Sequence, residues 1–384
     1  MLIERNAPHI QSLDKMDFSK IHFINNRAGG AYMAKYNIGV DFHKRFTYFV
    51  VKNSKGVVLK NGQVINKKDH VQKFLEGFTS DSAAVLESCR NWCVMHDWLE
   101  DIVDEVVLAN PYKVKAIAEA KIKTDKIDAS ILSDLLRADL VPRCYVAPKN
   151  VREMRNLLRE RIYFVRMRTM TKNRITTIFD RYPEEVRKEK AKTDLFGKKG
   201  RLQLENIDLR PADRALIDRE LNFIDFINVF IKEVEEVISD NFKASKNARF
   251  LKTIPGIGEF FSMLIDAEVG DINRFRNEKK FAAYIGLVPS TYSSGGSTVN
   301  GRIIKGGNKL LRWAFVEAVI PAITHDEYMR WEYNKLKERM NYNKAKTAMA
   351  RKLSSIAFKC LKEQRNYKKF NKIELEYKKL GRAS

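Results

Sequence analysis

Short apolar segments that each end on an acidic residue constrain the fold of this chain more than any other feature. Tyr36-Asn-Ile-Gly-Val-Asp41 and Ala83-Ala-Val-Leu-Glu87 have the apolar content of buried strands, and a carboxylate closes each of them. Between them, residues 46–51 and 57–65 are rich in β-forming side chains and flank the turn residues Asn53-Ser-Lys-Gly56. This order predicts a three-stranded meander followed by a further buried strand.

Helices and one more strand complete the pattern. A helical segment is predicted around residues 71–78 and a strand at residues 105–109, just before Asn110-Pro111. Lys123-Thr-Asp-Lys-Ile-Asp128 then opens an apolar helix, and its two acids lie three residues apart on one side of that helix. The first part of the chain is therefore expected to be an α/β domain.

The four acids of this region are candidate metal ligands. Mg²⁺ is a hard ion that prefers oxygen ligands, and a pair of such ions can hold the attacking and leaving oxygens of a phosphodiester. Each acid alone has a structural alternative, because an Asp at a helix start is usually an N-cap and an acid that ends a strand is often a turn residue. Their joint occurrence after a β-rich run favours a metal site formed by Asp41, Glu87, Asp125 and Asp128.

Two sets of motifs in the correct order carry a resemblance to a known family. The first set is Gly39-Val-Asp41-Phe-His-Lys44, Glu87, Asn110-Pro111 and Lys123-Thr-Asp-x-x-Asp128. The second set is Ile254-Pro-Gly-Ile-Gly258, Phe281-Ala-Ala-Tyr-Ile-Gly-Leu-Val-Pro-Ser290, Ser294-Gly-Gly296 and Lys305-Gly-Gly-Asn-Lys-Leu-Leu-Arg312. Over roughly residues 35–361 the chain resembles the DEDD transposases of the IS110 family of insertion sequences, which also includes the Piv-type DNA invertases.

The resemblance implies a fold class of α/β plus all-α. It implies an RNase-H-like (RuvC-like) domain at residues 35–148 whose acids bind Mg²⁺, a helical coiled-coil hairpin at 149–247, and a helical transposase domain at 248–384. It also implies that Ser294, which Ser293 precedes, is a nucleophile, and that a noncoding bridge RNA pairs with donor and target DNA. Residues 1–34 match no family motif and are expected to be a disordered or accessory leader.

Composition independently indicates a nucleic-acid partner. The chain has 71 Lys and Arg against 48 Asp and Glu, a formal net charge of +23 and a pI near 9.7, so it is expected to bind polyanions through counterion release. A hydrophobic content of 44% in 384 residues is enough for two or three cores. No apolar stretch approaches a membrane span, the first twenty residues lack a signal peptide, and the four cysteines are scattered. These features predict a cytoplasmic protein.

The middle of the chain predicts two long helices. From Val151 onward, apolar residues recur at helical spacing on a helix crowded with arginine, and Arg155, Arg159 and Arg166 are candidate nucleic-acid contacts. A second apolar run, Ile217 to Ile238, steps by threes and fours. This seam could close a hairpin within the chain or join protomers in a homodimer or homotetramer. The charged segment 184–211 is expected to be an exposed loop that touches RNA.

The C-terminal part carries further candidate contacts. The Pro-Gly-Ile-Gly turn in residues 251–265 is typical of a helix-hairpin-helix, in which Gly256 and Gly258 would expose backbone N–H groups to phosphate, although it can also be a plain helix connector. Residues 290–301 are mostly small or polar and predict a flexible loop, and the chain beyond residue 328 predicts a basic helical arm. Candidate phosphate ligands follow the serine: Arg302, Lys305, Lys309 and Arg312.

The sequence contains two smaller patterns and also permits two other functions. Cys89, Cys93 and His96 have the spacing of zinc ligands but lack a second pair, so a zinc site is not expected. His43 is interpreted as a polar strand-end residue rather than part of the metal site. The alternatives to a recombinase are a metal-only nuclease of the RNase-H or Holliday-junction type, in which Ser294 is structural, and a nucleic-acid-binding protein without enzymatic activity.

Overall fold

The structure is a computed structural model that describes residues 34–118, 124–183, 194–294, 297–304 and 306–369. The chain divides into two compact units, with the boundary between Ala147 and Pro148. The predicted leader at residues 1–34 lies outside the described residues except for Ala34. Within the described parts, no helix combines the length and the apolar character that crossing a bilayer requires.

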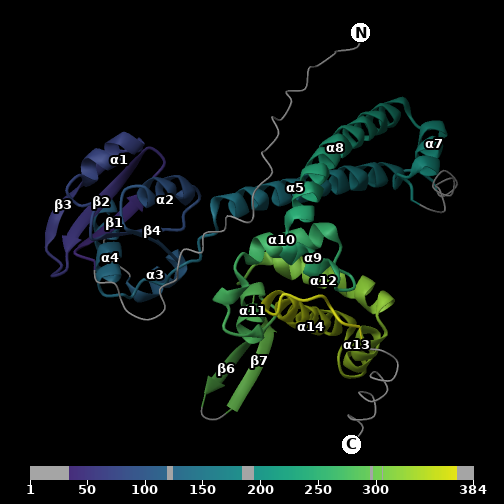
Figure 1. Cartoon of the computed structure of the whole chain (residues 1–384). Coiled ribbons are helices and arrows are strands. Elements are labelled where there is room, and N and C mark those ends of the chain that lie inside the picture. Colours follow the sequence, from purple (N-terminus) through teal and green to yellow (C-terminus); the bar gives the residue numbers. More distant parts are fainter. Residues whose placement is uncertain (1–33, 119–123, 184–193, 295–296, 305, 370–384) are drawn as a thin grey trace, which may run out of the picture. The chain divides into compact units, whose positions relative to one another are not determined.

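The first unit is built on one five-stranded sheet (Figure 1). Its strands are β1 (Tyr36–Phe42), β2 (Phe46–Asn53), β3 (Val58–Ile65), β4 (Ser82–Glu87) and β5 (Glu105–Ala109), in the spatial order β3-β2-β1-β4-β5. The first three pair antiparallel as a meander, whereas β4 and β5 are added parallel to β1. The predicted strands and the mixed α/β architecture are confirmed, and the order agrees with an RNase-H-like domain.

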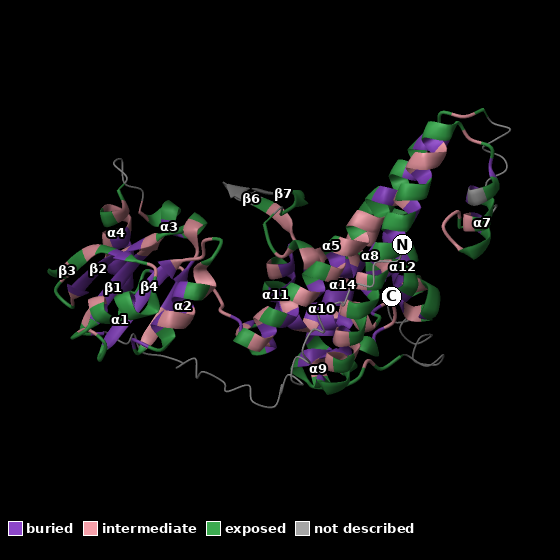
Figure 2. Ribbon diagram, turned by 90° about the horizontal axis from the view of Figure 1, so that it is seen from above, coloured by how far each residue is buried: buried purple, intermediate pink, exposed green. Residues whose placement is uncertain are grey.

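Helices cover both faces of this sheet because each strand alternates its side chains between two cores. On one face, Ile38 and Val40 pack with α1 (Lys68–Leu75) and α2 (Trp92–Glu100). On the other face, Ala83 and Val85 pack with α3 (Pro111–Ile117) and α4 (Asp125–Arg137). In Figure 2 the central strands β1 and β4 are largely buried, which is the pattern expected where both faces are covered, whereas the edge strand β3 is mostly exposed.

The second unit begins with a helical hairpin. Helices α5 (Lys149–Phe179) and α8 (Pro211–Ala244) pack against each other over much of their length (Figure 1). The apolar seam of α8 is buried inside the chain, with Ile217 packed near Ile175 and Ile238 near Met154. The intramolecular alternative for the seam is therefore confirmed. Because its side chains are already covered, the seam is not an exposed surface for joining protomers.

The predicted charged loop between these helices is in part helical. Helix α7 (Lys198–Asn206) occupies its second half, and Leu204 and Ile207 are buried against Leu221 of α8. The prediction of an exposed loop is wrong for this half, because two buried apolar residues hold a short helical segment against the hairpin. Residues 184–193 of the predicted loop lie outside the described residues.

The remaining elements form a helical bundle with one β-hairpin. The helices share one core that includes the base of the α5–α8 hairpin. The strands β6 (Pro289–Ser294) and β7 (Ser297–Ile303) replace the flexible loop predicted at residues 290–301. The helices are α9 (Lys246–Lys252), α10 (Glu259–Val269), the 3₁₀ turn η2 (Ile272–Arg274), α11 (Glu278–Ile285), α12 (Lys309–His325), α13 (Glu327–Arg339) and α14 (Tyr342–Lys362).

The last two described helices pack into this bundle. Ala345, Met349 and Leu353 of α14 are fully buried beside α11 and α12. The predicted helices beyond residue 328 are confirmed as α13 and α14, but they do not form an arm, because their apolar faces belong to the core. Residues 370–384 lie outside the described residues.

Candidate metal centre and serine hairpin

Asp41 and Glu87 stand at the same edge of the sheet. Strands β1 and β4 run parallel, and the last pair of their ladder is Val40 with Leu86. Asp41 and Glu87 each follow that pair by one residue, and alternation places both on the face that α4 covers. The backbone therefore places Asp41 and Glu87 at corresponding positions of neighbouring strands.

Helix α4 lies along β1 with a matched repeat. One face of β1 carries Asn37, Gly39 and Asp41, which are two residues apart. These three approach Ser133, Ala129 and Asp125 of α4, respectively, and those helix residues are four apart. Four helical residues rise about 6.0 Å and two strand residues about 6.6 Å, so the two repeats stay in step over this length. Because the two repeats stay in step, the first turn of α4 lies at the edge of the sheet where β1 ends.

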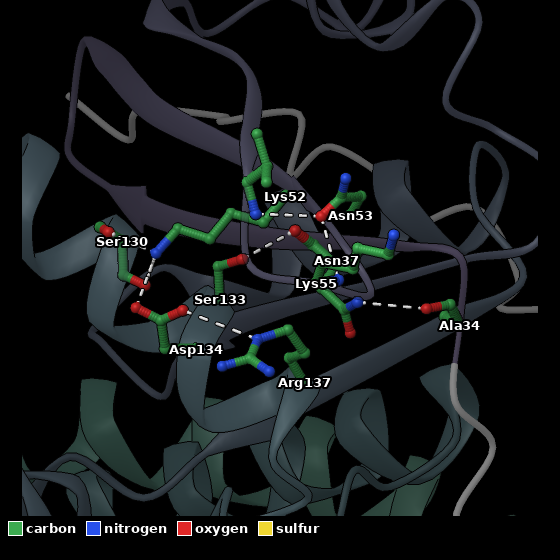
Figure 3. Close-up of polar contacts among 10 residues, drawn as sticks. Ala34, Asn37, Lys52, Asn53, Lys55, Ser130, Ser133, Asp134 and Arg137 are labelled. Carbon is green, nitrogen blue, oxygen red and sulfur yellow. Dashed lines mark hydrogen bonds and ion pairs between the residues drawn. The ribbon is translucent and has the colours of Figure 1, made fainter.

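Two close contacts fix this alignment. The Ser133 hydroxyl donates to the Asn37 carbonyl at 2.8 Å (Figure 3). Any Cβ on Gly39 would lie 1.8 Å from the Ala129 carbonyl oxygen, so β1 and α4 approach more closely than a side chain allows. Helix α4 itself begins at a Thr124 cap, whose hydroxyl accepts from the Ile127 N–H at 3.2 Å.

The acids of β1 and α4 meet around a histidine. His43 Nε2 lies 3.0 Å from Asp41 Oδ2 and 3.3 Å from Asp125 Oδ1. Burial raises the pKa of Asp41 above its ordinary value; His43 opposes this rise, and the charges of Asp125 and Asp128 add to it. A half-buried group of like charges is the setting that a divalent cation stabilises.

The residues present fit a divalent metal ion. Asp41, His43 and Asp125 each offer one ligand atom, and these atoms all lie within 4.8 Å of one another. Asp128 acts on Asp41 through its charge, and Glu87 stands on the neighbouring strand outside this group of three. His43 directly follows β1, as its interpretation as a strand-end residue predicted, and it is also a member of this candidate group. The signal for it was its spacing, because residue 43 follows Asp41 by one strand repeat.

Two of the predicted nucleic-acid arginines are engaged inside the second unit. Arg155 donates from Nε to the Ala267 carbonyl at 2.7 Å and from Nη2 to the Glu268 carbonyl at 3.2 Å. Arg159 donates to Glu268 Oε1 through Nε at 2.9 Å and Nη2 at 2.7 Å. Glu268 is buried and its other oxygen accepts from Asn308 Nδ2 at 2.7 Å. These contacts lock α5 to α10 and to the start of α12.

The third predicted arginine and the glycine turn lie elsewhere in this unit. Arg166 is exposed on α5. Gly256 has a φ of +85°, and a Cβ there would lie 2.2 Å from the Ala318 carbonyl oxygen, so this glycine is needed for packing on α12. Gly258 precedes α10 and has open space around it. Phosphate binding at this helix start stays a prediction.

Ser294 is the last residue of β6, and its backbone pairs with Ser297 next to the hairpin turn. The base of this hairpin is fixed by a backbone bond from Ile304 N–H to the Val288 carbonyl at 3.0 Å and by Arg312, which donates to the Ile304 carbonyl at 3.3 Å. Arg302 and Lys309 are exposed nearby in the chain, and Lys305 lies outside the described residues. The hairpin presents the serine segment at the end of two paired strands.

The cysteine and histidine pattern of α2 does not gather into a metal site among the described residues. His96 lies 3.7 Å from Asp97 and 3.6 Å from Glu100, and the group it forms with them contains neither Cys89 nor Cys93. All four cysteines of the chain are free thiols.

Comparison with known proteins identifies the family. A DEDD transposase model of the IS110 type matches residues 38–183, and a model described as Transposase IS116/IS110/IS902 family matches residues 248–334. The chain belongs to the IS110 family of insertion-sequence transposases. The transposase for insertion sequence element IS1111A of Coxiella burnetii is 27% identical over 268 residues, which is 68% of this chain and 72% of that protein. The transposase for element IS1328 of Yersinia enterocolitica is 26% identical over 278 residues, which is 71% of this chain and 81% of that protein.

Membership of this family implies DNA strand transfer and therefore DNA binding. The match to the DEDD model covers the sheet that carries the acids, and the second match begins at α9 and ends in α13. The resemblance predicted from the two sets of motifs is confirmed.

Proposed function

We propose that this transposase cuts and rejoins DNA with two kinds of catalytic group, a Mg²⁺ site built by Asp41, Glu87, Asp125 and Asp128, and the nucleophile Ser294. The observation that carries the proposal is the convergence of Asp41 and Asp125 around His43 at the end of β1. Carboxylate oxygens on two rigid elements suit a hard cation that must bind phosphate oxygens.

Each residue of the acid site has a separable task. Bound Mg²⁺ would withdraw charge from the phosphodiester and orient its oxygens. Asp41 is half-buried and rigidly held by β1, while Asp125 and Asp128 come from the first turn of α4. His43 hydrogen-bonds Asp41 and so orients that carboxylate, which is a common function of the groups around metal ligands.

The serine step conserves bonds and charge. The Ser294 oxygen attacks the phosphorus and forms an O–P bond, while the bond from phosphorus to one strand oxygen breaks. The serine proton leaves to solvent, and the departing strand oxygen takes up a proton. Attack by a hydroxyl of another strand on the same phosphorus then releases the serine and joins the new strands. Arg302 and Lys309 are exposed and follow the serine in the chain, which supports a role for them in binding phosphate oxygens.

We further propose that a noncoding bridge RNA guides the choice of DNA by pairing with donor and target. The net charge of +23 supports a polyanion partner, and the family resemblance supports RNA as that partner. The RNA is expected to co-purify with the protein at moderate salt. Unchanged target choice by protein that has been rigorously stripped of RNA would contradict the guiding role.

The metal site is tested by Asp41→Asn and Asp128→Asn, which keep shape and remove ligand charge. Both are expected to lose strand transfer and to retain the wild-type unfolding temperature within a few degrees. Asp69→Asn is the matched control, because Asp69 is an exposed acid on α1, and helix α1 packs on the other face of the sheet. Full strand transfer by either site variant, or by wild type in excess chelator, would refute the metal site.

The nucleophile is tested by trapping on nicked DNA and mapping the modified peptide by mass spectrometry. Ser294→Ala is expected to abolish the protein–DNA adduct, whereas Ser293→Ala retains most of it, since only a correctly aimed oxygen gains the advantage of proximity. Strand cleavage that proceeds without any adduct would support the metal-only nuclease instead.

Exchange between two duplexes requires several cuts held together, so we propose a homodimer or homotetramer on DNA. The serine and the acids belong to different compact units of the chain. Mixing Ser294→Ala protein with Asp41→Asn protein is expected to restore part of the activity if the two groups act from different protomers. Absence of rescue at every mixing ratio would assign both groups to one protomer.

A further inference from the structure

Lys52 of β2 is a buried lysine, and its ammonium group makes all of its hydrogen bonds to helix α4. Its side chain is 6% exposed. The Nζ atom donates to the Ser130 carbonyl at 3.2 Å, to the Ser130 hydroxyl at 2.7 Å and to Asp134 Oδ2 at 2.6 Å (Figure 3). An ammonium has three N–H donors, and all three acceptors lie on α4. Because a buried charge is costly unless it is paired, this arrangement is strongly favoured over any in which α4 is displaced.

The lysine stands beside the strand residue that also holds α4. Lys52 is paired across the ladder with Asn37, and cross-strand partners project to the same face of a sheet. Asn37 accepts from Ser133, and Lys52 binds Ser130 and Asp134, so the two neighbours contact one turn and a half of α4. These contacts lie on the same helix as the two acids of the metal site.

Hydrogen bonds and ion pairs fix the position of a helix along the sheet that it covers. Apolar contacts alone define this position less sharply. The apolar side of α4, with Leu132 and Leu135, keeps the helix on the sheet. A slip of one residue would move Asp125 by about 1.5 Å along the axis and turn it by about 100°. Metal ligands must lie within about 0.2 Å of their ideal distances, so such a slip would destroy the site.

We propose that Lys52 is a positioning residue of the metal site: its ammonium holds α4 in the register that brings Asp125 and Asp128 to Asp41. The inference rests on the proposed metal site and adds a residue that carries no ligand atom. Loss of contacts that orient metal ligands commonly weakens metal binding by roughly 10–100-fold.

The chain offers a matched control on the opposite face of the sheet. Lys60 of β3 donates from Nζ to the Phe74 carbonyl of α1 at 2.7 Å. It is thus another lysine that ties a strand to a helix, but α1 carries none of the four acids. A purely structural role for such lysines predicts equal effects of Lys52→Met and Lys60→Met on metal affinity.

The test measures binding of Mn²⁺ alone to the full-length protein by electron paramagnetic resonance of the free ion. Lys52→Met is expected to raise the Kd by roughly tenfold or more, and Lys60→Met is expected to leave it within twofold of wild type. Asp41→Asn defines the signal of the site, because it removes a proposed ligand. Circular dichroism checks that each variant is folded.

A second variant keeps the test decisive if Lys52→Met does not fold. Asp134 is half-exposed, and Asp134→Asn removes the charge that faces Lys52 while it keeps the shape and an oxygen that can accept from Nζ. It is expected to raise the Kd severalfold. Wild-type affinity in folded Lys52→Met, or in Asp134→Asn where Lys52→Met does not fold, with binding lost in Asp41→Asn, would overturn the role of Lys52 alone. Wild-type affinity in Asp41→Asn would instead overturn the metal site, and the inference with it.

Discussion

Gly39→Ala is expected to separate α4 from β1 and to damage the metal site without touching a ligand. The added methyl group would lie 1.8 Å from the Ala129 carbonyl oxygen and 2.8 Å from the Ser133 N–H nitrogen, both of which are backbone atoms. Ordinary contact begins near 3.4 Å, so the helix must retreat by about 1.6 Å. No side-chain rotation can relieve the clash.

The expected cost follows from this retreat. Overpacking of a close-packed contact costs about 1–3 kcal/mol, and loss of the bond from Ser133 to Asn37 adds about 1 kcal/mol. For a unit of this size, about 3 kcal/mol corresponds to a fall in Tm of roughly 10 °C. The retreat also moves the first turn of α4, so Mn²⁺ binding is expected to weaken by more than tenfold.

The assay is differential scanning calorimetry of the full-length protein together with Mn²⁺ titration. Gly62→Ala is the matched control, because Gly62 is also a strand glycine of this sheet and its added methyl group would meet the movable Phe74 ring at 3.3 Å. We expect a shift below about 3 °C and unchanged metal affinity for the control. An unchanged Tm and unchanged affinity in Gly39→Ala would refute the close approach of β1 and α4.

Three further predictions concern the second unit. Arg159→Ala is expected to lower Tm by roughly 6–9 °C because it leaves a buried carboxylate unpaired, whereas Arg166→Ala is expected to spare Tm and weaken nucleic-acid binding measured by filter retention. Gly256→Ala is expected to destabilise the fold, and Gly258→Ala to leave Tm unchanged, so only the latter reports on phosphate binding. The pKa of Asp213 is lowered by a tyrosine hydrogen bond and nearby arginines, so its stabilisation is present above about pH 3.9 and is lost as pH falls through the lowered pKa. The Tm gap between wild type and Asp213→Asn should therefore close below about pH 4; a gap that stays constant with pH would exclude this ion pair as its cause.

The sheet and the position of its acids could be predicted from the sequence because both follow from local patterns. Apolar runs that end on Asp41 and Glu87 fix the strands, and the spacing of Asp125 and Asp128 fixes their helix face. The parallel addition of β4 to β1 then brings the strand ends to one edge. Each of these steps uses residues within a few positions of one another.

Contacts between distant segments could not be predicted in this way. The basic helix offered Arg155 and Arg159 as nucleic-acid contacts, but their acceptor Glu268 lies more than a hundred residues further along the chain. A charged side chain has the same sequence signal whether it faces solvent or a buried acid. The apolar seam had the same limitation, since its spacing defines a face but not the surface that covers it.

The start of α4 also explains why acids can gather at this edge before a cation binds. A helix N-terminus carries a partial positive charge that stabilises a nearby carboxylate by about 0.3–1 kcal/mol. Repulsion between two carboxylates about 4 Å apart is about 1 kcal/mol in water and about 4 kcal/mol near a protein surface. Burial is the largest cause of the raised pKa of Asp41, and His43 opposes that rise. The contacts of Gly39 and Lys52 hold α4 against the sheet, so packing keeps Asp41 and Asp125 close although their charges repel each other.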